Sequence, residues 1–480
     1  MAGTMSSEQT TRPAQSAERV SSHAPAKRSA VSSFVDFAGG GALPEWPLEV
    51  FLEVSNICDL QCAMCPTFSA LNPNRFNILK NNDRGLIAYE QATTPLQTVL
   101  EHALIVHAFG YGEPTIHPQF REFIQYLSQF EVMVDFFTHG MHLDEAMCEF
   151  LVASGVVRIS ISFSGATQEE YENVYLGGDF ERVLRGIRAL RAAKERAQSN
   201  YPIIEINSLG FRHHIDKLPA FVQLMGENGV NLIHLKPLQT YDEVRELHGH
   251  TSVMRPEIEG PILEEAKAIA ARYELRLASD PYEQTAAALD NFPDNPLRSR
   301  HKGREAMSDE TVPIAELKTI ARSRDKKAEQ REAAAKEDGV PADTTARFMH
   351  HAGTPCLEPF KTLYASFNGK VYPCCFKNDK GAPLGDLNNA TGAAIWAGER
   401  ATTIQQQALT GHYPADLCGR CLKSSTYPGY HNLAMKLNQY SDWYQQRFAA
   451  PFAPELQQVV KALPDNRGII AAHGGGDSRK

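Results

Sequence analysis

Three cysteines lie close together in the segment SNICDLQCAMCPTF, residues 55–68, where Cys58, Cys62 and Cys65 have the spacing C-x3-C-x2-C. A structural zinc site needs four nitrogen or sulfur ligands, but the next histidine or cysteine along the chain is His102. Three thiolates on a cluster of four irons leave one iron open, and catalysis at a metal needs an open coordination position. The segment therefore favours a catalytic iron–sulfur cluster over zinc.

A second group of cysteines lies near the C-terminus. It consists of Cys356, Cys374, Cys375, Cys418 and Cys421. The C-x2-C pair at 418 and 421 has a usual metal-ligand spacing, and the C-x17-C pair at 356 and 374 completes a set of four. These residues alone do not separate zinc from iron–sulfur. Cys375 is left over, either as a small buried apolar residue or as a hydrogen-atom donor or alternative ligand.

The elements that must position these cysteines alternate between strand and helix. Apolar runs predict strands at 48–54, 103–109, 132–137, 157–163, 203–209, 231–237 and 275–279. The segments between them carry apolar residues at helical spacing, which predicts a parallel α/β architecture, either a full or partial barrel or an open sheet. In each case the active site lies at the carboxyl ends of the strands, where the first cysteine segment begins. Cys148 falls on an outer helix, where we expect a structural role.

Polar side chains recur on one face of three successive predicted strands. They are Ser160, Ser162 and Ser164, then Glu205 and Asn207, then His234 and Lys236. Strands covered by helices and a dry core are expected to be apolar on both faces. Each polar residue alone is compatible with a satisfied core hydrogen bond, but the three strands together favour a polar lumen that holds a ligand.

Composition limits the classes of function. The chain has 480 residues, a formal net charge of −9 and 42% apolar residues, which is typical of two or three domains. The mild acidity argues against a nucleic-acid surface, and the sequence has no run of 18 apolar residues that could span a membrane. Nine cysteines at short spacings indicate metal or redox chemistry in a reducing cytoplasm rather than a disulfide framework.

Shifts in composition suggest the domain boundaries. Residues 1–45 are predicted to be a disordered tail rather than a transit peptide, and 46–285 form the α/β core. The charged segment 286–350 lacks an apolar stripe and is expected to be a solvated helix or disordered insertion, with a substrate lid or partner arm as the alternative. Residues 351–430 form the cysteine-rich domain, in which FNGKVY predicts a hairpin, and 431–480 a C-terminal helix and tail.

The order of the motifs resembles the radical S-adenosylmethionine (radical SAM) superfamily. After the cysteine segment come FGYGEP (109–114), similar to the family's Gly-Gly-Glu-Pro, and THG (138–140), similar to its Thr-Asn-Gly. SFSGA (162–166) stands where relatives have Ser-Ile-Asp-Gly. The resemblance covers about residues 47–280 and implies a partial (β/α)6 barrel.

The resemblance also implies cofactors. Cys58, Cys62 and Cys65 would ligate a 4Fe–4S cluster that binds S-adenosylmethionine (SAM) and cleaves it to a 5′-deoxyadenosyl radical, with a flavodoxin or ferredoxin as electron donor. The expected SAM contacts are Met64, Gly112, Glu113, Pro114, Ser162 and Asn207. Tyr111 departs from the family pattern, because it replaces the usual first glycine.

The C-terminal cysteines resemble the SPASM, or shortened twitch, extension of the same superfamily. This resemblance implies one auxiliary 4Fe–4S cluster on Cys356, Cys374, Cys418 and Cys421.

Several functions are compatible with these features. The resemblance to dehydrogenases with a single auxiliary cluster favours oxidation of a small polar substrate, such as a sugar or aminocyclitol alcohol. His234 or Lys236 would then accept the hydroxyl proton. Epimerisation of a sugar or peptide needs a hydrogen-atom donor, which is often a cysteine. Two cysteines that are not predicted cluster ligands could serve, Cys375 and Cys148. Modification of a ribosomal peptide is the third reaction, although the N-terminal 45 residues are too short and too polar for a leader-binding domain. A metal-bound scaffold without activity is the alternative outside enzymes.

Overall fold

The computed structural model describes residues 22–65, 67–69, 84–211, 214–236, 256–279, 356–375, 381–410, 414, 417–418, 440–445 and 447. Seven strands follow one another in parallel through the first part of the chain. They are β1 (Glu49–Leu52), β2 (Ile105–His107), β3 (Met133–Thr138), β4 (Arg158–Ser162), β5 (Ile203–Leu209), β6 (Leu232–Lys236) and β7 (Arg276–Ala278). Each strand pairs in parallel with the next. These strands confirm the seven predicted from apolar runs.

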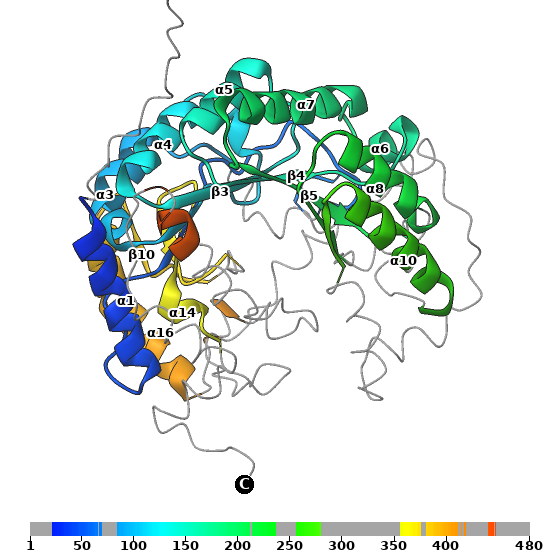
Figure 1. Ribbon diagram of the computed structural model, residues 1–480. Coiled ribbons are helices and arrows are strands. Elements are labelled where there is room, and N and C mark those ends of the chain that lie inside the picture. Colours follow the sequence, from blue (N-terminus) through cyan, green and yellow to red (C-terminus); the bar gives the residue numbers. More distant parts are fainter. Residues whose placement is uncertain are drawn as a thin grey trace, which may run out of the picture.

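Helices cover the outer face of this curved sheet (Figure 1). They are α3 (Tyr89–His102), α4 (Phe120–Leu127), α5 (Glu145–Ala153), α6 (Gln168–Val174), α7 (Phe180–Ala197), α8 (Leu218–Glu227) and α10 (Pro256–Arg272). Short 3-10 turns lie at η2 (Pro114–Ile116), η3 (Ser128–Phe130) and η4 (Ile215–Lys217). The main core lies between helices and sheet and includes Phe123, Phe136, Ile161 and Cys148, as expected for an outer-helix cysteine. The fold is therefore a partial barrel of βα units.

The C-terminal segment continues the same sheet. It contributes α14 (Glu358–Lys361), β8 (Thr362–Ala365), β9 (Lys370–Tyr372), β10 (Gly385–Asp386), α15 (Gly392–Trp396) and α16 (Glu399–Leu409). The predicted hairpin is present, because β8 and β9 pair antiparallel, and Gly369 supplies a positive φ of 80° at the turn. Unexpectedly, β8 also pairs in parallel with β1, which gives the strand order β10-β9-β8-β1-β2-β3-β4-β5-β6-β7.

The prediction of a disordered tail over residues 1–45 is wrong for helix α1 (Ala24–Ala38). Its residues Val31, Phe34 and Phe37 are buried at helical spacing, and Phe37 stacks on Phe360 of α14 with ring centroids 4.7 Å apart. The Ser- and Ala-rich composition hid this short apolar stripe. Residues 1–21 lie outside the described part of the chain.

Two other predicted segments lie wholly or partly outside the described residues. The charged segment 286–350 is one, and most of 431–480 is the other, although Tyr440 to Trp443 are helical and buried at their ends. Across the described ranges no helix is both long and apolar enough to cross a membrane.

Candidate iron–sulfur site

The three cysteines at 58, 62 and 65 lie in the loop that follows β1, at the carboxyl end of the sheet. Burial raises the pKa of the Cys62 thiol, and the neighbouring cysteines raise it further. Burial also raises the pKa of Cys65, but the backbone N–H groups of Thr67 and Phe68 donate to its Sγ at 3.4 and 3.3 Å. Burial disfavours the charged thiolate, and coordination to a metal compensates for that cost, so this donor set fits a metal cluster.

The glycine of the GEP motif packs directly on this loop. A Cβ on Gly112 would lie 2.5 Å from the carbonyl oxygen of Ile57, and the next residue, Glu113, donates its backbone N–H to the same oxygen at 2.8 Å. The structure therefore brings the predicted SAM motif against the predicted cluster loop. Only glycine permits so close an approach of the two backbones.

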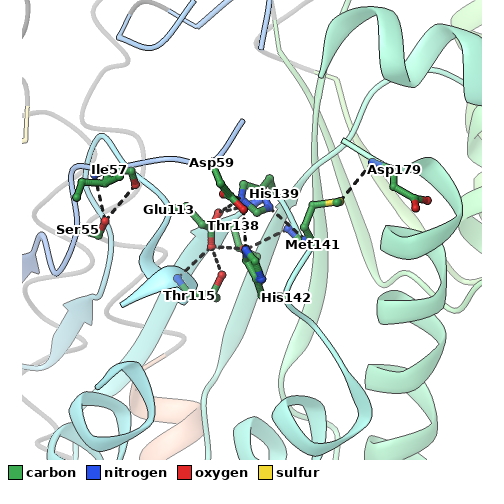
Figure 2. A network of polar contacts seen from close by, with 11 residues as sticks. Ser55, Ile57, Asp59, Glu113, Thr115, Thr138, His139, Met141, His142 and Asp179 are labelled. Carbon is green, nitrogen blue, oxygen red and sulfur yellow. Dashed lines mark hydrogen bonds and ion pairs between the residues drawn. The ribbon is translucent and has the colours of Figure 1, made fainter. Parts of the chain in front are cut away.

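The carboxylate of Glu113 is buried and held by the THG motif. Its Oε1 accepts hydrogen bonds from the Thr138 hydroxyl at 2.7 Å and from the Thr115 N–H at 3.1 Å. Its Oε2 accepts from the His139 N–H at 2.8 Å (Figure 2). The side chain thus has a fixed orientation at the end of β3, which suits a carboxylate that must receive an ammonium group.

A carboxylate flanked by two histidines adjoins the first cysteine, and the sequence reasoning missed it. Asp59 Oδ1 lies 2.7 Å from His139 Nε2, and Oδ2 lies 2.9 Å from His142 Nε2 (Figure 2). The hydrogen bond from His139 holds the pKa of Asp59 well below its ordinary range. Ligand atoms of Cys58, Asp59 and His139 all lie within 4.8 Å of one another. The signal in the sequence was the histidine that replaces asparagine in the family's Thr-Asn-Gly.

The predicted contacts on β4, β5 and β6 fall into one row across the sheet. Ser162 is the register partner of Asn207, and Asn207 is the register partner of His234. Asn207 Oδ1 is buried and accepts no hydrogen bond from any described residue. An orphaned acceptor in the lumen indicates that a ligand group belongs there.

Below this row a ladder of buried charges crosses the lumen. His107 Nδ1 lies 2.6 Å from Asp135, and its Nε2 lies 3.5 Å from Glu49. Arg158 bridges Asp135 at 2.5 Å and Glu205 at 3.4 Å. Burial alone would raise the pKa of Asp135, but His107 and Arg158 outweigh it and hold that pKa well below its ordinary range. The alternation of acidic and basic side chains gives each of them an oppositely charged or titratable neighbour.

Two further residues, Met64 and Pro114, are predicted to contact SAM and lie near the cysteine loop. Met64 is partly buried against the main core, and Pro114 is buried at the start of η2. Their roles stay predictions.

The C-terminal cysteines gather beside β8 and β9. Burial raises the pKa of Cys374, and Cys375, Cys356 and Cys418 lie close enough to raise it further. Cys375 therefore adjoins the set, and its role stays open. Cys421 lies outside the described residues. A buried group of thiols again fits a metal cluster.

Comparison with protein families agrees with both sites. The description "Radical SAM superfamily" matches residues 52–217, and the SPASM description "Iron-sulfur cluster-binding domain" matches residues 356–422. The fold is α/β, and the two matched ranges contain the two groups of cysteines. Residues 52–217 thus form a radical SAM domain and residues 356–422 a SPASM domain, and these domains imply 4Fe–4S clusters and SAM as cofactors.

Relatives of known function are distant. The chain is similar to the mycofactocin maturase MftC of Mycobacterium ulcerans, at 26% identity over 186 residues, which are 39% of this chain and 46% of the relative. It is also similar to the PqqA peptide cyclase of Gluconobacter oxydans, at 27% identity over 206 residues, which are 42% of this chain and 51% of the relative. The match spans about half the length of these relatives.

Solved structures with a similar arrangement include Streptococcus suis SuiB bound to the precursor peptide SuiA, at 13% identity and a TM-score of 0.46, covering 78% of this chain and 72% of SuiB. Another is anSMEcpe with bound AdoMet, at 15% identity and a TM-score of 0.46, covering 86% of this chain and 99% of that one.

Proposed function

We propose that this protein is a radical SAM enzyme that modifies a peptide. The observation that carries the proposal is the cysteine loop packed on the Gly112–Glu113 motif, opposite a lumen with the orphaned acceptor of Asn207. Two named relatives support the peptide as substrate class, since one is a peptide cyclase and the other a maturase. The proposed substrate class therefore differs from the sugar or aminocyclitol alcohol that the sequence analysis favoured. No finding directly supports oxidation of such a small molecule.

The chain's own residues have separable tasks in this proposal. Cys58, Cys62 and Cys65 hold the cluster, which with SAM supplies a 5′-deoxyadenosyl radical when both are bound. Glu113, fixed by Thr138, accepts hydrogen bonds from the amino group of SAM.

Dehydrogenation of a small polar molecule is a second candidate, and His234 favours it. Its Nε2 lies 3.9 Å from Glu205, and burial lowers the pKa of His234 below its ordinary value. A neutral imidazole in the middle of β6 can accept a proton from a substrate hydroxyl. An electron donor of the flavodoxin or ferredoxin type and a cytoplasmic location belong to both candidates as predictions.

Release of 5′-deoxyadenosine tests the proposal before any substrate is known. Anaerobically reconstituted protein with SAM and dithionite is expected to form it, whereas Cys58→Ala forms none because the cluster lacks a ligand. Reconstituted protein is also expected to hold about eight iron atoms per chain, for two 4Fe–4S clusters. A fully iron-loaded sample that never cleaves SAM would overturn the enzyme assignment. Addition of candidate peptides then separates the two candidates, since only a peptide-modifying enzyme changes peptide mass.

A further inference from the structure

Lys236 is a cation that reaches across the lumen. It ends β6, and two strands, β5 and β4, separate it from β3. Its Nζ nevertheless lies 5.5 Å from the ring centroid of Phe137, which stands on β3. The lysine side chain therefore spans the interior of the barrel instead of leaving through its mouth.

The ammonium of Lys236 makes no ion pair or hydrogen bond with the described part of the chain. The nearest acidic residue that influences it, Glu205, is engaged with Arg158 and Ser160. Burial lowers the pKa of Lys236, and its ammonium lies over the aromatic face of Phe137. Among the described residues no carboxylate pairs with this partly buried ammonium, so the site is complementary to a negatively charged group.

An aromatic wall extends from this ammonium toward the second cysteine site. Phe137 packs on Phe109 with centroids 4.6 Å apart, Phe109 on Phe51 at 5.7 Å, and Phe51 on Tyr364 at 5.9 Å. Tyr364 shares an apolar cluster with Cys375 and Cys418. The wall thus connects β3 to β8. Phe137 and Phe109 are only partly buried, whereas Phe51 and Tyr364 are buried.

We propose that Lys236 binds a carboxylate of the substrate while the partly exposed rings of Phe137 and Phe109 pack against the apolar part of the same molecule. The inference rests on the proposed function and narrows its substrate class. For a peptide, the carboxylate is an Asp or Glu side chain or the C-terminus. SAM also carries a carboxylate, but its expected contacts end at Ser162 and Asn207, whereas the ammonium lies over Phe137 at the start of the aromatic wall.

Two small probes that differ only in charge test this assignment. They are 3-phenylpropionate and 3-phenylpropionamide, added to the full-length protein with both clusters rebuilt and SAM saturating, with binding followed by ligand-observed NMR. The carboxylate is expected to bind about tenfold more tightly than the amide, because it gains a charge-assisted hydrogen bond. Lys236→Gln is expected to abolish this difference, and Lys236→Arg to keep part of it. Lys267→Gln, on the outer helix α10, is the matched control and keeps all of it.

Other outcomes overturn the inference. Equal binding of both probes to the unaltered protein shows that no carboxylate site exists on the wall. If Lys236→Gln keeps the preference for 3-phenylpropionate but weakens SAM binding about tenfold, the cation serves the carboxylate of SAM. Release of 5′-deoxyadenosine by the unaltered protein is measured in parallel. If the protein cleaves SAM but binds both probes equally, only the role of Lys236 as a carboxylate-binding residue is contradicted. If the protein does not cleave SAM, the proposed function is contradicted.

Discussion

At the scale of the residue, Gly112 is where the two halves of the cofactor site touch. A Cβ at this position would meet both the N and the O of Ile57, at 2.6 and 2.5 Å. Both atoms belong to backbone, which cannot rotate away as a side chain can. The position of the cysteine loop therefore depends on the absence of one methyl group.

Gly112→Ala is expected to displace the cysteine loop. We expect a loss of roughly 1–3 kcal/mol in the free energy of unfolding from overpacking, together with a lower iron content at the first site. Chemical denaturation and iron analysis after reconstitution measure the two effects. Gly260→Ala in α10 is the control, since nothing lies within 4 Å of its Cβ, and it is expected to stabilise the protein by about 0.5–1 kcal/mol. Unchanged iron in Gly112→Ala would contradict the close approach.

Many residues of the candidate site could be predicted from the sequence alone. The iron–sulfur cluster was predictable from the spacing of Cys58, Cys62 and Cys65, and the SAM contacts from the GEP motif. In both cases the residues that define the site are close together in the sequence. The pairing of Asp59 with His139 was not predictable, because it depends on how two loops 80 positions apart fold over each other. The path of Lys236 across the lumen likewise depends on rotamers, which the sequence pattern does not determine.

At the scale of the element, α1 is tied to α3 by a buried lysine. Lys27 Nζ donates to the carbonyl oxygens of Leu100 at 3.3 Å and Ala103 at 2.5 Å, at the C-terminus of α3. These carbonyls end a helix and have no partner within it. A cation is favourable at a helix C-terminus, but full burial opposes its charge.

The Lys27 contact predicts a pH dependence of stability. Burial lowers the pKa of Lys27 from 10.5 to about 7. Between these values the unfolded chain binds a proton that the folded protein does not, so this group makes stability rise with pH from about 7 to about 10.5. Below about pH 7 both states are protonated, and its contribution is constant.

Lys27→Met is expected to remove this rise. The free energy of unfolding of the unaltered protein minus that of Lys27→Met should therefore grow from about pH 7 to about pH 10. Denaturant titrations at both pH values measure it, and subtraction of the variant cancels the titration of other groups. A difference that stays constant or shrinks would show that Lys27 is charged in the folded protein at neutral pH.

The strands were predictable as elements, whereas α1 was not. Apolar runs such as IIEINSL at 203–209 match β5 at both ends, because a strand buried under helices must be largely apolar. Helix α1 has an apolar stripe of only a few residues, spread among Ser and Ala. Its stability comes from packing on α14 and α3 rather than from local helix propensity. The sequence of the segment does not show which other elements it packs against.

At the scale of the whole molecule, Glu53 joins the barrel to the C-terminal domain. Its buried carboxylate accepts hydrogen bonds from the Tyr111 N–H at 2.9 Å, the Ser366 hydroxyl at 2.7 Å and the Phe367 N–H at 3.4 Å. Tyr111 leads into the SAM motif, and Ser366 begins the turn between β8 and β9. Glu53 and Ser366 are 313 positions apart, so sequence pattern could predict a C-terminal hairpin but not its place beside β1.

Glu53→Ala is expected to weaken both sites together. Orphaned buried donors and a cavity should lower the free energy of unfolding by roughly 2–4 kcal/mol. Because β8 and β1 belong to one sheet, unfolding should remain a single transition, and iron should fall at both clusters. Glu53→Gln, which keeps the shape and one acceptor, is the matched variant and should lose less. Separate transitions for the two domains, or loss of iron at one site alone, would contradict this coupling.

The continuous sheet has a consequence for the movement of charge. The strand that leads to Cys374 is the second neighbour of the strand that leads to Cys58, and adjacent strands lie about 4.8 Å apart, so these two strands are separated by about 10 Å. A continuous hydrogen-bonded sheet fixes the spacing of its strands and does not allow the two domains to move as if they were joined by a hinge. Because β8 runs parallel to β1 but antiparallel to β9, the end of β9 that leads to Cys374 lies at the edge of the sheet opposite to the end of β1 that leads to Cys58. The sheet therefore sets the separation of the two groups of cysteines along the strands as well as across them, and the tunnelling of an electron slows steeply with distance. The exchange of an electron between the two centres should therefore be indifferent to solvent viscosity, which governs the rates of loop and domain motion.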